Sequence, residues 1–134
     1  MANGLYSLFK EDLLNKLLDL NTDTIKVQLI DTANYTVALT THHYYSEIAA
    51  GARIGTATTL ATPTIALGVF DAANTTITAV TGATVEALVI YQAAGTEGTS
   101  ILICYIDTAS QGLPFTPNGG DVTITWNASG IFAL

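Results

Sequence analysis

The sequence has 134 residues and a mass of 14.0 kDa, which is the size of one domain. It contains 11 acidic and 4 basic residues, and this net charge of −7 argues against a nucleic-acid partner, because phosphate binding needs clustered Lys and Arg. Only 11% of the residues are charged, against about 25% in an average soluble domain. Much of the surface must therefore be neutral, or be covered by another protein.

At the start of the chain, over about residues 4–20, apolar residues recur with the spacing of an α-helix. The apolar residues on or near its stripe are Leu5, Leu8, Phe9, Leu13, Leu14, Leu17 and Leu18. Asn3 is the expected N-cap, and residues 21–23 are the expected end. The stripe predicts a helix that covers one face of a sheet. A detachable arm that reaches a neighbouring subunit is the competing interpretation.

Short β-strands are predicted over most of the remaining chain, because β-forming runs are separated by turn residues. The expected runs are 25–30, 52–62, 64–70, 75–80, 122–126 and 131–134. The runs 52–62 and 64–70 are expected to form a strand pair broken near Pro63. Asp31, Asp71 and Asp107 each follow a β-type run, and their carboxylates are expected to accept backbone N–H groups and turn the chain.

The stretch 85–107 is the expected centre of the protein. Two nearly unbroken apolar runs flank a loop with Gly95 and Gly98, which predicts an antiparallel hairpin covered on both faces. No apolar run is long enough to span a membrane. We therefore expect a mainly β protein, with one antiparallel β-sandwich domain over residues 1–134 and one N-terminal α-helix.

Few residues suggest a catalytic or metal-binding site. His42 and His43 beside Glu47 could begin a metal site, but adjacent strand residues point in opposite directions and the sequence offers no third ligand. Cys104 lies within an apolar run and is expected to be a buried, inert thiol. We therefore predict no catalytic residues, no metal and no cofactor, and we expect that the chain is not an enzyme.

A contact surface is predicted where aromatic residues gather. Tyr35, Tyr44 and Tyr45 supply large amphipathic side chains, and His42 and His43 lie beside them in the sequence. With so few charges on the surface, we expect self-association, or attachment to a lattice of other subunits, through this region.

Nine short segments, spread over nearly the whole chain, carry a resemblance to a known family. They are 1–6, 23–27, 31–37, 50–53, 68–72, 86–91, 105–109, 116–121 and 131–134. With these segments the chain resembles a family of small structural proteins in the virions of tailed bacteriophages. The resemblance implies a virion location after assembly in the bacterial cytoplasm, and it brings no catalytic residues.

The expected function is therefore structural. The chain is expected to be a capsid decoration or cement protein that stabilises the phage head, with the major capsid protein or other virion proteins as partners. One alternative is a tail, neck or baseplate protein. Another is a glycan-binding or receptor-binding module, in which Trp126 and the tyrosines form a platform for sugar rings.

Overall fold

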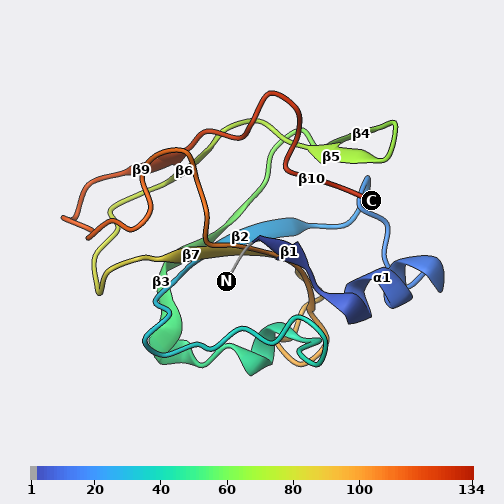
Figure 1. The fold of residues 1–134 in the computed structure, drawn as a ribbon, viewed down its shortest axis with the longest axis horizontal. Helices are drawn as coiled ribbons and strands as arrows, with labels where there is room; N and C mark the ends of the chain where they lie inside the picture. Colours follow the sequence, from blue (N-terminus) through green and yellow to red (C-terminus); the bar gives the residue numbers. More distant parts are fainter. Residues whose placement is uncertain (1–2) are drawn as a thin grey trace.

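A computed structural model describes residues 3–134 and shows two layers of antiparallel strands (Figure 1). The larger layer is a five-stranded sheet in the order β1-β8-β7-β2-β3. In that order its strands are Gly4–Leu5, Ile101–Ile106, Ala87–Gln92, Ile25–Ile30 and Arg53–Thr59. Two short 3₁₀ helices, Tyr45–Glu47 and Ala50–Ala52, precede β3. None of the helices in this described part of the chain could cross a membrane.

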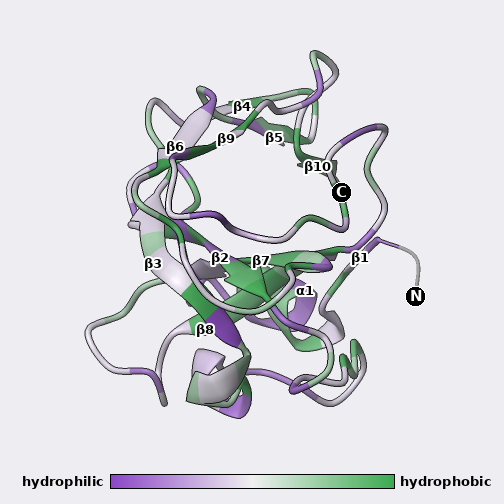
Figure 2. Ribbon diagram, turned by 90° about the vertical axis from the view of Figure 1, so that its left-hand side faces the viewer, coloured by the Kyte–Doolittle hydropathy of each residue, from purple (hydrophilic) through white to green (hydrophobic). Residues whose placement is uncertain are grey.

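The second layer lies above this sheet and is built from two smaller sheets (Figures 1 and 2). One has the order β10-β5-β4, and the other pairs β6 with β9. The strands are β4 (Thr64–Ala66), β5 (Val69–Asp71), β6 (Thr75–Ile77), β9 (Val122–Ile124) and β10 (Phe132–Ala133). The prediction of a mainly β, antiparallel sandwich with one α-helix near the N-terminus is confirmed.

The hairpin of β7 and β8 forms the centre of the larger sheet, as the sequence predicts. β7 pairs with β8 on one side and with β2 on the other, so its backbone groups are bonded along both edges. Five consecutive residues are buried in each strand, 87–91 and 101–105. Side chains on both faces of these strands are therefore removed from water, which requires the near-continuous apolar pattern. These strands form a connected green region in Figure 2.

The N-terminal helix is shorter than expected: α1 spans Ser7–Leu14 and not 4–20. Gly4 and Leu5 instead form β1, which pairs with Tyr105 and Cys104 of β8. This pairing supplies partners for the backbone groups along the edge of β8, which a helix could not do.

The expected N-cap is also wrong. Asn3 lies before β1, where its Oδ1 accepts the backbone N–H groups of Asp107 and Thr108, both at 2.9 Å. Its Nδ2 donates to the carbonyl of Thr108 at 3.0 Å. The N-cap of α1 is Tyr6, which makes no side-chain capping bond. Asn3 therefore fastens the start of the chain to the end of β8.

The helical stripe packs against the sheet only in part. Phe9 is fully buried, whereas Leu14 and Leu17 are 85% and 62% exposed. The reason is that α1 ends at Leu14 and the chain turns at Lys16, which has a φ of 61°. The stripe assumes a helix that continues to residue 20, so the expected burial of Leu17 is wrong.

The expected pairing of 52–62 with 64–70 is wrong too. β3 pairs with β2, and the segment 64–71 folds into its own hairpin of β4 and β5 in the other layer. Leu67 and Gly68 form the turn, with φ values of 53° and 78°. Two successive positive φ values match the twist of a two-residue hairpin, which explains why the chain reverses here.

The acidic turn residues act as predicted at two positions. Oδ1 of Asp31 accepts the N–H of Ala33 at 2.9 Å, and Oδ1 of Asp71 accepts the N–H of Ala72 at 2.9 Å. Each carboxylate thus satisfies a backbone donor where a strand ends. Asp107 accepts a bond from the hydroxyl of Thr108 at 3.1 Å, and its expected bond to a backbone N–H group stays a prediction.

Candidate functional site

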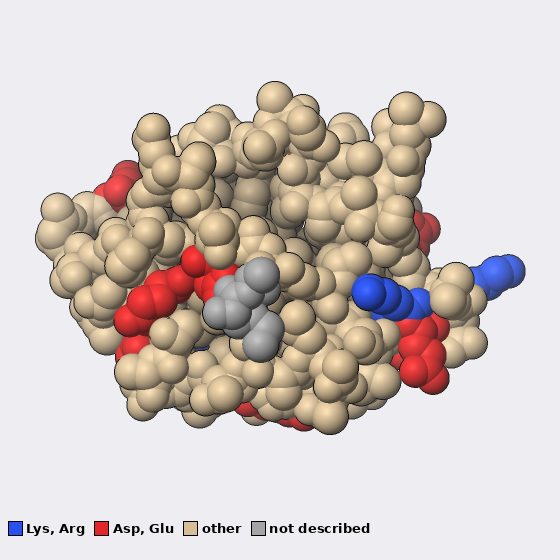
Figure 3. Space-filling model, viewed as in Figure 1, with Lys and Arg blue, Asp and Glu red and all other residues tan. Residues whose placement is uncertain are grey.

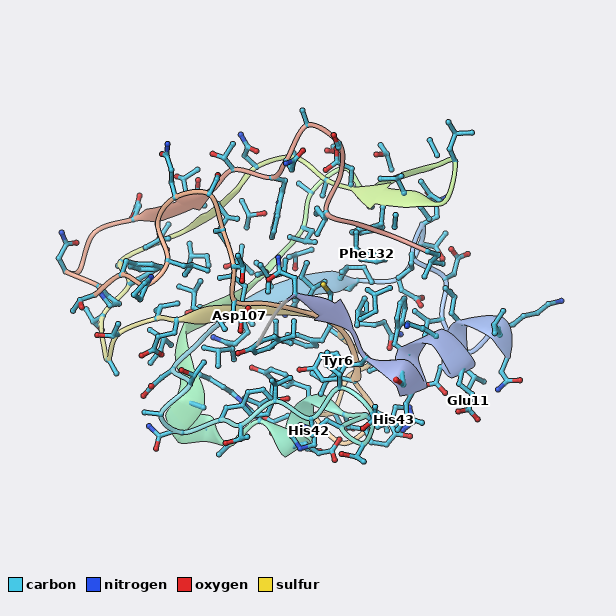
Figure 4. The ribbon with its side chains drawn as sticks, viewed as in Figure 1. Tyr6, Glu11, His42, His43, Asp107 and Phe132 are labelled. Carbon is cyan, nitrogen blue, oxygen red and sulfur yellow. The ribbon has the colours of Figure 1, made fainter. Side chains whose placement is uncertain are left out.

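The predicted aromatic contact surface lies largely inside the protein. Tyr35 is only 5% exposed, and its hydroxyl lies 2.9 Å from that of Tyr6 and 2.8 Å from Nδ1 of His42. Tyr6 is fully buried below the central sheet (Figure 4). The three side chains form one hydrogen-bonded chain from the core to the half-buried His42, so they join the loop around residue 40 to the sheet.

Tyr45 is also an internal residue, at 7% exposure. Its ring stacks on Tyr91 with centroids 4.0 Å apart, and the guanidinium of Arg53 lies 4.0 Å from the ring centroid. Its hydroxyl donates to Oε1 of the buried Gln28 at 2.7 Å. Arg53 in turn forms a two-pronged ion pair with Glu97, at 2.6 and 3.1 Å. Tyr45 therefore anchors the 3₁₀ segment onto β2 and β7.

His43 and Glu47 hold the same loop in other ways. Nε2 of His43 pairs with Oδ2 of Asp12, a buried residue of α1, and the His43 ring stacks on Tyr44. The carboxylate of Glu47 accepts the backbone N–H groups of His43 and Tyr44. His42, His43 and Glu47 thus serve three separate interactions. Residues 3–134 contain no group of three or more side chains suited to hold a metal ion.

The predicted partner surface must therefore be corrected. Tyr35 and Tyr45 cannot offer contact area to another protein in this fold, because their rings are packed against other residues of the same chain. Tyr44, His42 and His43 are half-buried, and their role in partner contact stays a prediction. Tyrosines that lie close together in a sequence can equally belong to a core in which their hydroxyls are hydrogen-bonded. The residues that bind Tyr35 and Tyr45 here include Tyr6, Gln28 and Tyr91, which are distant in the sequence.

Cys104 is confirmed as a buried thiol. It is 4% exposed on β8, and burial raises its pKa to about 12. A thiol with such a pKa is almost entirely protonated near neutral pH, so it is a poor nucleophile.

Burial of the tyrosines makes the stability of the fold sensitive to alkaline pH. Burial raises the pKa of Tyr35 to about 12, and burial likewise raises the pKa values of Tyr6, Tyr45, Tyr91 and Tyr105. In the unfolded chain a tyrosine loses its proton near pH 10. The unfolded state therefore releases protons first, and the stabilisation present below about pH 10 is lost as the pH rises toward about 12.

We expect the free energy of unfolding, measured with urea, to be constant from about pH 7 to 9 and to fall steeply above about pH 10. Tyr35→Phe should make this fall shallower, because one buried phenol no longer titrates. Constant stability up to about pH 12 in the unsubstituted protein would contradict the assignment of these phenols to the core.

The most exposed apolar residues gather at one end of the molecule. The large apolar side chains with high exposure are Leu14, Leu17, Ile65, Leu67 and Leu134. They come from α1 and the residues after it, from the β4–β5 hairpin and from the C-terminus, which lie together at the right of Figure 1. We call these five residues the apolar end.

A shallow groove of about 600 Å³ runs through the apolar end. Leu17, Ile65 and Leu134 line it, together with the partly buried Leu13. The N–H of Leu134 donates to the carbonyl of Gly68 at 3.0 Å, which holds the C-terminus beside the hairpin turn. This surface could not be predicted from the sequence, because the exposure of Leu14 and Leu17 depends on where the helix ends.

A second hollow lies between the two layers of strands. Two adjoining cavities of about 540 and 760 Å³ share the side chains of Leu88, Ile124 and Trp126. Val122, Ile124 and Trp126 face the same side, as their alternation predicts, but they are only half-buried. We call this hollow the interlayer cleft. Figure 3 shows that the surrounding face carries few charged side chains.

No protein-family model matches the chain, and a search of curated proteins finds no match either. The resemblance to virion proteins of tailed bacteriophages therefore stays a prediction. The apolar end and the interlayer cleft are the two surfaces from which a function can be argued.

Proposed function

We propose that this chain is a non-enzymatic virion structural protein that attaches to an assembled phage capsid as a decoration or cement protein. The observation that carries the proposal is the apolar end. Five large apolar side chains from three separate segments are exposed at this end, at 49% to 103% of their full exposure. Leu17, Ile65 and Leu134 line one groove, whose rim also carries the charged residues Lys16, Asp19 and Asp23. Contiguous apolar surface of this kind is typical of a site that another protein covers.

The size of the apolar end fits attachment to a repeated lattice. Burying a fully exposed Leu contributes about 1.5–3 kcal/mol, so the five side chains could contribute roughly 5–10 kcal/mol. Bringing two proteins together costs an estimated 4–15 kcal/mol. The apolar end alone would thus give weak binding to one subunit. A lattice site supplies contacts from neighbouring subunits as well, which would favour a capsid over a single free partner.

Leu67→Asn tests this proposal without endangering the fold. Leu67 is fully exposed, and its φ of 53° is a conformation that Asn adopts more easily than Leu. We expect an unchanged or slightly higher melting temperature, together with affinity for capsids that is about ten- to hundredfold weaker, since one Leu anchor is lost. The measurement is co-sedimentation with capsids of the encoding phage that lack this protein.

Ala79→Asn is the matched control. Ala79 is also exposed with a φ of 50°, but it follows β6, away from the apolar end. It should bind capsids as the unsubstituted protein does. Equal capsid binding by both variants would contradict the proposed attachment surface.

The copy number in purified particles separates the two virion locations. A decoration protein should be present in numbers comparable to the lattice sites of the head. A handful of copies per particle would instead place the chain in the tail, neck or baseplate.

A further inference from the structure

The interlayer cleft is lined by both apolar and neutral polar side chains. Leu88 of β7 and Ile106 of β8 are opposite each other in the larger sheet, and both line the cleft. Ile124 and Trp126 contribute from the other layer. The volumes of the two adjoining cavities lie within the range of about 300–1,000 Å³ that is usual for small-molecule sites.

Trp126 is held in place by residues outside the cleft. Its indole Nε1 donates to Oγ1 of Thr75 at 3.3 Å, and its backbone N–H donates to Oδ1 of Asn74 at 3.2 Å. Thr75 is itself buried. The indole N–H is therefore satisfied within the protein, and the rest of the half-buried ring borders both cavities. A ring fixed in this way is a preorganised apolar platform.

Neutral polar side chains surround this platform. Ser110, Gln111 and Thr125 line the cleft, and their side chains form no hydrogen bond with any other described residue. Asn127 also lines it, and its Oδ1 accepts the N–H of Ser129 at 2.8 Å, so its amide N–H₂ group remains available. These hydroxyl and amide groups can donate and accept hydrogen bonds without carrying charge.

The charges around the cleft disfavour an ionic ligand. Asp121 is the one ionisable side chain among its lining residues, and its Oδ1 accepts the N–H of Ala79 at 3.0 Å. No Lys or Arg lines either cavity, and the chain carries a net charge of −7. Among the described lining residues an anion would find no Lys or Arg, and a cation would find a single carboxylate that is already bonded.

We propose that the interlayer cleft binds a neutral carbohydrate. The apolar C–H face of a sugar ring packs on the indole of Trp126. Its hydroxyl groups bond with Gln111, Ser110 and Asn127. Sugars present one apolar face and a rim of uncharged hydroxyls, which matches an aromatic platform bordered by neutral donors and acceptors. This site is independent of the apolar end and of capsid attachment.

The protein contains one tryptophan, so its fluorescence reports on the cleft directly. The probes are maltohexaose, cellohexaose, mannohexaose and chitotetraose, all uncharged. We expect at least one of these sugars to change the emission of Trp126 saturably, with a dissociation constant in the millimolar range or lower. Sulfated sugars should cause no such change. In a ¹⁵N NMR titration the same sugar should shift the signals of the Trp126 indole and of the side-chain amides of Gln111 and Asn127.

The double variant Ser110→Ala with Gln111→Ala removes two exposed hydrogen-bonding groups from the rim. It should keep its melting temperature and bind the active sugar about tenfold more weakly or worse, as expected for lost polar contacts. The control is Thr41→Ala, an exposed residue outside the cleft, which should bind normally.

Four results would overturn the proposal. The first is the absence of a saturable response to all four sugars, in both fluorescence and NMR. The second is stronger binding of sulfated than of neutral sugars. The third is binding that the double variant retains in full, because contacts with Ser110 and Gln111 are then not used. The fourth is a shift of these NMR signals that a peptide causes and none of the sugars causes, because the cleft would then bind a segment of another protein.

Discussion

Deletion of residues 1–21 is expected to abolish cooperative unfolding. The segment contributes Tyr6 and Phe9, both fully buried, and Leu18 and Leu20, which are 7% and 6% exposed. Burial of four large side chains contributes roughly 6–12 kcal/mol. This equals most of the 5–15 kcal/mol by which a small domain is usually stable. The deletion also removes β1 and so exposes the edge of β8, which favours aggregation.

Single substitutions in the intact chain provide the matched comparison. Phe9→Ala should lower the free energy of unfolding by about 3–5 kcal/mol, because it leaves a cavity in the core beside Phe132. Leu14→Ala, in the same helix but at an 85% exposed position, should change it by no more than about 0.5 kcal/mol. Thermal and urea unfolding measure both.

The detachable-arm interpretation makes the opposite forecast. A truncated chain that melts cooperatively at the original temperature, yet no longer binds particles, would support an arm. The fixed positions of Phe9 and Asp12 argue against that outcome. The ring of Phe9 packs edge-on against Phe132, with centroids 6.0 Å apart, and Asp12 pairs with His43. Both contacts join α1 to parts of the chain that are distant in sequence.

The centre of the fold was predictable because its signal is local. Strands buried on both faces need apolar residues at nearly every position, and only the runs near 87–91 and 101–105 meet this demand. The alternation of Val122, Ile124 and Trp126 likewise predicted which side chains share a face. It could not predict their half-burial, because the width of the cleft depends on how the two layers are joined.

The N-terminal segment and the aromatic cluster were mispredicted because their structure depends on distant partners. Asn is a residue type that is common at N-caps, but the side chain of Asn3 binds the backbone N–H groups of Asp107 and Thr108 after β8, about 105 residues away. The sequence suggests that Tyr45 contacts a partner, whereas in the fold its side chain is surrounded by Gln28, Tyr91 and Arg53. Periodicity and composition describe neighbours along the chain, whereas these contacts are made across it.

The packing of the C-terminal segment on β5 depends on Gly130, and Gly130→Ala is expected to cost about 2–5 kcal/mol of stability. Gly130 has a φ of 106°, which disfavours any side chain. An added Cβ would clash with Cγ1 of Val69 and would lie 3.2 Å from the carbonyl oxygen of Phe70. The clash would disturb the pairing of β10 with β5 and the stacking of Phe132 on Phe70.

Two comparisons separate the backbone contribution from the clash. Gly95 has a φ of 90°, and an added Cβ there meets nothing within 4 Å, so Gly95→Ala should cost only the backbone part, about 1–2 kcal/mol. Val69→Ala removes the atom that an added Cβ at Gly130 would strike. In a double-mutant cycle it should therefore recover part of the loss caused by Gly130→Ala. If urea unfolding gives equal losses for Gly130→Ala and Gly95→Ala, with no coupling to Val69, then close packing at Gly130 does not hold the C-terminal segment on β5.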